Sequence, residues 1–141
     1  MRSFFDTSAL VPVLYGDHVH HAASIARFIQ SDKTSDSCAV HSLVEVYSTL
    51  TSMPGRHCIS SEQAMLFIDS ISERLSAVAL DGKECADALK AAASLGIVGG
   101  GIYDAMIAHC ALKAKADVIY SWNTRHYSLC GAAVTELLRT P

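Results

Sequence analysis

Four oxygen-bearing residues from distant parts of the chain, Asp6, Glu45, Asp104 and Asn123, could share one reactive site. Three of them are formal anions, which repel one another unless cations neutralise them. A hard divalent ion, Mg²⁺ or Mn²⁺, suits such a group, and Asn123 can add a carbonyl oxygen. Ions held in this way activate water and stabilise the charge that develops when a phosphodiester is hydrolysed. The residue types therefore point to phosphoryl chemistry.

The elements that must position these residues are strands alternating with helices. Strands are expected at residues 2–6, 36–40, 76–80 and 117–121, with a last short strand near 133–137. Helices are expected at residues 9–15, 20–30 and 42–52, from residue 60, and at residues 81–95 and 103–116. Every connection is too long for a hairpin, so the pattern predicts an α/β fold with a parallel sheet between helices.

In such a sheet, ligands bind beyond the carboxyl ends of the strands. Asp6 is the last residue of the first strand, and Glu45 lies one turn into the helix after the second. Asp104 opens the helix that leads to the fourth strand, and Asn123 comes just past that strand. Asp117, by contrast, is the first residue of the fourth strand and is expected at the opposite end. The topology thus brings the four candidates to one edge.

Each acid also has a purely structural interpretation. Asp6 could be a turn former, and Glu45 could belong to the polar face of its helix. Asp104 could be a helix cap that the macrodipole favours. Thr7 or Ser8 is expected to cap the first helix. The joint placement of the acids at one edge is what favours a site.

Composition limits the class of protein. A chain of 141 residues fits a single domain over residues 1–141, and 50% hydrophobic residues indicate an apolar surface covered by a partner, such as a second copy or a peptide. The net charge of −3 argues against passive nucleic-acid binding through basic patches, but it is compatible with an acidic site that acts through cations. No stretch predicts a membrane span or a signal peptide, so a cytoplasmic protein with reduced cysteines is expected.

The sequence resembles the PIN-domain family and, within it, the VapC-type toxins of bacterial toxin–antitoxin pairs. The resemblance covers nearly the whole chain and rests on four stretches: Phe5-Asp6-Thr7-Ser8-Ala9-Leu10, Leu43-Val44-Glu45-Val46, Tyr103-Asp104-Ala105-Met106-Ile107-Ala108, and Tyr120-Ser121-Trp122-Asn123-Thr124-Arg125-His126-Tyr127.

This resemblance implies a three-layer sandwich around a mostly parallel sheet of four to five strands. It also implies a Mg²⁺- or Mn²⁺-dependent endoribonuclease that acts on tRNA, rRNA or mRNA. Such a protein is expected to form a homodimer and to be inhibited by an antitoxin whose C-terminal segment occupies its groove.

By matching positions, the resemblance makes Asp6, Glu45 and Asp104 metal ligands and Ser8 a hydrogen-bond partner in the site. Many family members have Asp where this chain has Asn123. That departure concerns a second ion, and the first ion does not depend on it.

Three residues next to Asn123 are candidates for contact with RNA. Arg125 and His126 could contact the backbone, and Trp122 could either stack on a base or pack at the sheet edge. Two other functions stay open. One is an RNA-binding module with a weakened or lost metal site, which Asn123 and the low basic charge suggest. The other is an acidic site that acts on structured DNA or on a small phosphoester.

Overall fold

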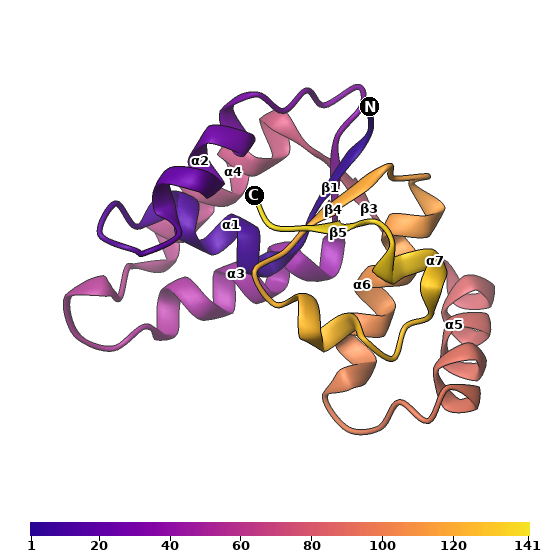
Figure 1. The fold of residues 1–141 in the computed structure, drawn as a ribbon. Helices are drawn as coiled ribbons and strands as arrows, with labels where there is room; N and C mark the ends of the chain where they lie inside the picture. The colour runs from indigo at the N-terminus through magenta and orange to yellow at the C-terminus, as the bar shows by residue number, and fades with distance from the viewer.

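The computed structural model describes residues 1–141 and shows a parallel sheet between two layers of helices (Figure 1). The order of the strands across the sheet is β3-β2-β1-β4-β5. The strands are β1 (Ser3–Phe5), β2 (Ser37–Ala39), β3 (Ser76–Val78), β4 (Val118–Tyr120) and β5 (Leu138–Arg139). The helices are α1 (Thr7–Leu14), α2 (His21–Ile29), α3 (Val40–Ser52), α4 (Ser61–Arg74), α5 (Gly82–Ser94), α6 (Gly101–Lys113) and α7 (Ala132–Thr135), with 3₁₀ turns at Gly55–His57 and Thr124–Tyr127. The predicted α/β sandwich is confirmed, and all its strand pairs are parallel.

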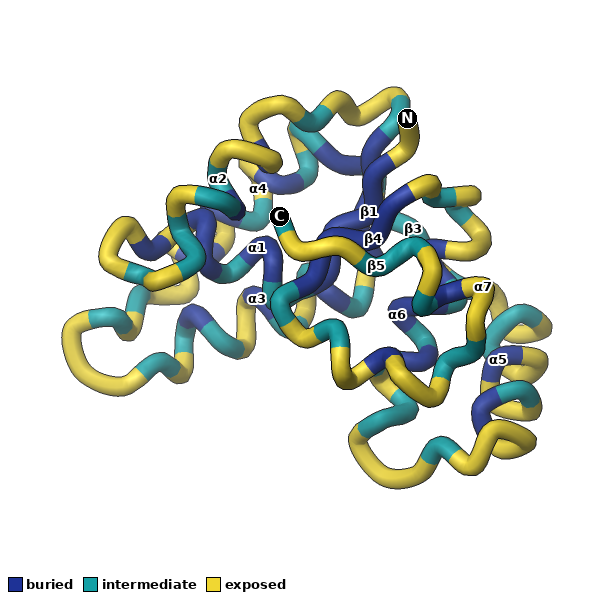
Figure 2. Tube along the Cα trace, viewed as in Figure 1, coloured by how far each residue is buried: buried dark blue, intermediate teal, exposed yellow.

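The two faces of the sheet carry two separate cores. Phe5 and Tyr120 belong to the core under α1, α2, α3 and α4, whereas Phe4 and Ile119 belong to the core under α6 and α7. This alternation follows from the two-residue period of a strand, and burial on both faces explains why β1 and β4 are apolar runs (Figure 2). Phe5 pairs with Tyr120, so the carboxyl ends of β1 and β4 lie side by side.

The start of α1 differs from the prediction. Asp6, not Thr7 or Ser8, occupies the N-cap position, and its side chain makes no capping hydrogen bond. The helix consequently begins two residues earlier than expected and runs through Pro12. The Asp6 carboxylate does not cap α1 because it accepts hydrogen bonds from three side-chain hydroxyl groups.

The last predicted strand, at residues 133–137, is wrong. Most of that segment forms α7, and the strand β5 follows it at Leu138–Arg139. Gly131 has a φ of 89°, a conformation that favours glycine, and this turn leads the chain into α7. Val134 then packs into the core on that side of the sheet. Alanine-rich segments favour helix, so the apolar character of the segment was a poor sign of a strand.

No helix combines the length and the apolar character that crossing a membrane would require.

Candidate active site

Asp6 lies at the carboxyl end of β1, where three hydroxyl groups hold its buried side chain. Tyr127 donates to Oδ1 at 2.6 Å, and Ser8 and Ser121 donate to Oδ2 at 2.7 and 2.9 Å. The two serine Oγ atoms also approach each other to 3.2 Å. Each serine hydroxyl has one proton and uses it in the hydrogen bond to Asp6. The contact between the two serines therefore adds no further hydrogen bond. The three donors fix the orientation of the carboxylate.

Glu45 projects from the second turn of α3 toward the same edge. Its Oε1 atom lies 3.1 Å from Nε2 of His41, one turn earlier on the helix. No donor is aligned to hydrogen-bond with this buried oxygen. Glu45 therefore presents an unsatisfied acceptor, which a native structure does not retain without a reason.

Asp104 lies in the first turn of α6, with Oδ2 3.7 Å from Nδ1 of His126. Burial raises the pKa of Asp104, the charge of Asp6 raises it further, and His126 and His41 oppose the shift. Burial likewise raises the pKa of Glu45; His41 opposes this, and Asp6 and Asp104 add to it. Three acids from three segments thus influence one another electrostatically.

The donor chemistry of this cluster suits a hard cation: it consists of carboxylates that repel one another, and one of their oxygens is buried and unsatisfied. The geometry is less complete, since no group of three His, Cys, Asp or Glu side chains is arranged to hold a metal ion. Both oxygens of Asp6 already accept hydrogen bonds from hydroxyl groups. Each carboxylate oxygen can accept more than one partner, so these hydrogen bonds do not exclude an ion, but bringing all three acids onto one ion would require side-chain movement.

The loop after β4 forms the other side of the site. A pocket of about 300 Å³ is lined by Trp122, Asn123, Thr124, Arg125 and His126. Trp122 stacks on His20, with ring centroids 3.7 Å apart, and its Nε1 donates to Ser24 at 2.8 Å. These contacts hold the indole against α2 and cover one of its faces. Arg125 and His126 remain exposed.

Comparison with known proteins places the chain in a family. The family profile described as "PIN domain" matches residues 3–132. The chain belongs to the PIN-domain family. Ribonuclease VapC27 of Mycobacterium tuberculosis is 31% identical to this PIN domain over 114 residues, which are 80% of this chain and 79% of that protein.

Two solved structures share the fold of this PIN domain. The crystal structure of VapBC2 from Rickettsia felis bound to a DNA fragment from their promoter matches with a TM-score of 0.66 and 14% identity, over 100% of this chain and 99% of that one. The structure of VapBC-1 from nontypeable Haemophilus influenzae matches with a TM-score of 0.65 and 18% identity, over 99% and 98% of the two chains.

The site of this PIN domain contains residues that the sequence did not single out. Tyr127 and Ser121 hold Asp6, whereas the expected fourth member, Asn123, is exposed in the neighbouring pocket. His41 lies between Glu45 and the ring of Tyr103. Ser121 and Tyr127 could have been noticed, because both stand in the same motif as Asn123. Nothing in the sequence around His41 distinguishes it from an ordinary residue of a polar helix face.

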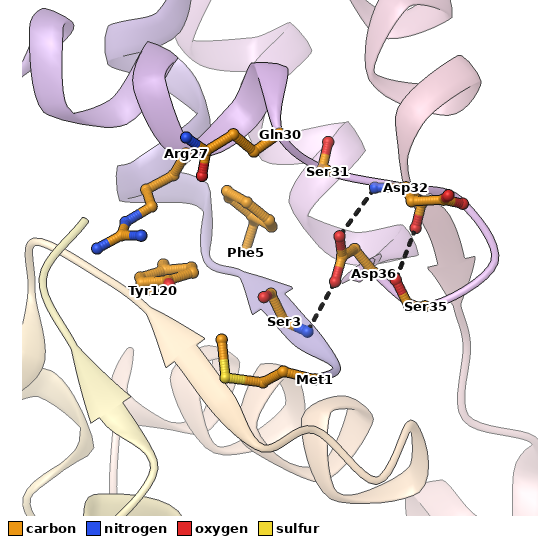
Figure 3. Close-up of a pocket in the computed structure, with 10 residues that line it drawn as sticks. All are labelled: Met1, Ser3, Phe5, Arg27, Gln30, Ser31, Asp32, Ser35, Asp36 and Tyr120. Carbon is orange, nitrogen blue, oxygen red and sulfur yellow. Dashed lines mark hydrogen bonds between the residues drawn. The ribbon is translucent and has the colours of Figure 1, made fainter.

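A second polar pocket of this PIN domain lies at the amino edge of the sheet, away from the acids (Figure 3). It has a volume of about 240 Å³ and lies between the end of α2 and β1. Its buried carboxylate, Asp36, accepts hydrogen bonds from the backbone N–H groups of Ser3 and Asp32, both at 2.8 Å. Asp36 thus ties the loop before β2 to the start of β1, which is a structural role.

Asp36→Ala is expected to destabilise the PIN domain by about 3 kcal/mol, because two backbone N–H groups lose a charged acceptor and one of them is buried. Urea denaturation followed by circular dichroism measures this change. Thr34→Ala serves as the control, since it removes an exposed hydrogen bond in the same loop and should cost under about 1 kcal/mol. Equal stability of the two variants would contradict the role of Asp36.

Proposed function

We propose that this PIN domain is a Mg²⁺- or Mn²⁺-dependent endoribonuclease, the toxin of a toxin–antitoxin pair. The observation that carries the proposal is the group of Asp6, Glu45 and Asp104 at one sheet edge, close enough to raise the pKa of Glu45 and Asp104 and with a buried, unsatisfied Glu45 oxygen. The ribonuclease relative from M. tuberculosis supports RNA as the substrate.

The residues of the site divide the work between them. Asp6, Glu45 and Asp104 would hold the ion, which when bound supplies an activated water and stabilises the developing charge on the phosphate. Ser8, together with Ser121 and Tyr127, keeps the Asp6 carboxylate oriented.

The exposed pocket lined by residues 122–126, beside the acids, provides the contact with the RNA strand. Arg125 and His126 bind the phosphate backbone there, and Asn123 lines the same pocket. The indole of Trp122 has one face on His20, so only its other face is available to a base.

The proposal includes partners. The two structures of similar fold are VapBC proteins, which supports a cognate antitoxin as the inhibitor of this chain. The proposed protein is a cytoplasmic homodimer. A second copy would cover exposed apolar side chains, of which Val44, Leu66 and Val98 are each more than 60% exposed. The substrate is tRNA, rRNA or mRNA, in a single-stranded segment whose phosphate can reach the recessed acids.

Incubation of the purified protein with single-stranded RNA and with DNA of the same sequence tests the activity. Cleavage of RNA is expected with Mg²⁺ or Mn²⁺ and not in EDTA, and DNA should remain intact. Mn²⁺ should also raise Tm, because an ion that binds only the folded state at 100 times its Kd stabilises it by about 2.7 kcal/mol. RNA cleavage that persists in EDTA would refute the metal dependence, and equal cleavage of DNA would refute the substrate class.

A second candidate function is an RNA-binding module that does not cleave. It is favoured by the absence of any preformed group of three metal ligands. Calorimetric titration with Mn²⁺ distinguishes the two candidates. A binding module should bind RNA with no heat from Mn²⁺, whereas a nuclease should bind the ion with an affinity that Asp104→Asn weakens.

A further inference from the structure

We propose that an apolar pocket beside the acids binds one unpaired nucleobase next to the phosphate that is cleaved. The inference rests on the proposed ribonuclease function and adds how the RNA strand is placed. One base lies on one side of the acids, and the phosphate backbone lies on the other.

The pocket has a volume of about 380 Å³ and lies over the carboxyl ends of β2 and β3. This volume is in the lower part of the range for small-molecule sites, roughly 300–1,000 Å³. Its apolar walls come from the start of α3, the segment after β3 and the middle of α6, and they include Val40, Leu80, Met106 and Cys110.

Two aromatic rings connect this pocket to the acids. The rings of His41 and Tyr103 both line it, lie nearly parallel at an interplanar angle of 3° and have centroids 5.4 Å apart. His41 also approaches Glu45 to 3.1 Å, and Tyr103 is the residue before Asp104. A base on these rings would therefore lie beside a phosphate held at the acids. Tyr103 is 56% exposed, so its ring is accessible to such a base.

The polarity around the acids favours RNA in one orientation. On one side the pocket is apolar and aromatic; on the other, Arg125 offers positive charge to the backbone and His126 offers a polar ring beside it. Each nucleotide carries a flat apolar base and an anionic phosphate, so a strand that crosses the acids satisfies both sides at once.

The base would be recognised by stacking more than by hydrogen bonds. The carbonyl group of Ala79, at the wall of the pocket, already accepts a hydrogen bond from Lys113 at 2.8 Å. With few polar groups left to read a base edge, the pocket is expected to prefer purines over pyrimidines by a few-fold, because purines stack over a larger area.

RNA oligonucleotides with a single 2-aminopurine, a fluorescent purine, placed in turn at each position around the cut test this site. In EDTA, where the RNA stays intact, the wild-type protein is expected to quench the fluorescence at one position adjacent to the cut. Tyr103→Leu should lose this quenching and bind RNA roughly 5- to 100-fold more weakly, and Tyr103→Phe should retain both. Tyr47→Leu, the same change on an exposed part of α3 outside the pocket, is the matched control.

A second arm uses an abasic nucleotide at the quenched position. It should slow cleavage by wild-type protein in Mg²⁺ by about the same factor as Tyr103→Leu slows cleavage of intact RNA, and the two changes together should cost little more than either alone.

The outcomes separate this inference from the proposed function. If no RNA is cleaved, the proposed function fails and this inference fails with it. If RNA is cleaved but no position is quenched, or if Tyr103→Leu still quenches, only the base pocket is refuted. A change in sedimentation from dimer to monomer in Tyr103→Leu, with quenching kept, would assign the pocket to an interface between two copies and also refute it.

Discussion

Asp104→Asn is expected to reduce RNA cleavage by about a thousandfold or more while leaving the metal-free protein at least as stable as the wild type. A metal ion contributes several kcal/mol of transition-state stabilisation, and Asn replaces a charged ligand by a neutral one of nearly the same shape. The stability follows from the charges: burial and Asp6 both raise the pKa of Asp104, which means that its ionised form is unfavourable in the folded protein.

The effect of the Asp104 charge on the stability of the fold depends on pH. An acid whose pKa is raised by folding binds protons more tightly in the folded state, so its contribution to stability falls as pH rises. For Asp104 the fall begins near the ordinary value of 3.8 and is complete above the raised folded pKa. In EDTA at pH 7, Asp104→Asn should therefore melt roughly 1–3 °C above the wild type, a small shift because solvent screens this partly exposed group.

Asp87→Asn provides the matched control, because Asp87 is an exposed acid on α5 that pairs with Lys83 at 3.6 Å. It should leave both cleavage and Tm nearly unchanged. Thermal melts with and without EDTA and the initial rate of RNA cleavage give the two readouts. Normal cleavage by Asp104→Asn would refute the role of the acid, and a large fall in Tm would show that Asp104 mainly stabilises the fold.

The sequence predicted those parts of the structure that depend on local or regular rules. The helices expected from residues 60 and 81 are present, and each begins with a capping box between residues three apart, Ser60 with Gln63 and Asp81 with Glu84. Asp117 lies at the amino edge and accepts a hydrogen bond from the backbone N–H of Arg2, as the parallel topology requires.

The sequence could not predict contacts that depend on how distant segments pack. Asp6 was predicted as a site residue or a turn former, but not as the acceptor for Ser121 and Tyr127, which are 115 and 121 residues away. The register in which β1 pairs with β4 brings these side chains together. The same limit applies to the stacking of His41 on Tyr103, because the two rings come from different helices, α3 and α6.

Tyr127→Phe is expected to slow RNA cleavage by about 10- to 100-fold and to weaken Mn²⁺ binding by a similar factor. Groups that orient metal ligands typically have effects of this size. The fully buried Tyr127 hydroxyl is the donor to Oδ1 of Asp6, so Phe leaves that oxygen without a hydrogen bond and free to turn. The same loss should destabilise the fold by about 1–3 kcal/mol.

Tyr15→Phe separates positioning from stability in this experiment. Tyr15 is another buried tyrosine, and its hydroxyl donates to the carbonyl oxygen of His57 at 2.8 Å, away from the acids. Its loss should also lower the free energy of unfolding, by roughly 1 kcal/mol, but cleavage and the Kd for Mn²⁺ should stay as in the wild type. Both variants are compared well below their Tm, so that unfolding does not contribute. If Tyr127→Phe loses stability and keeps its Mn²⁺ affinity, the hydroxyl serves the fold alone. If only Tyr127→Phe loses affinity, the hydroxyl that binds the carboxylate at the end of β1 also sets the geometry of the metal site.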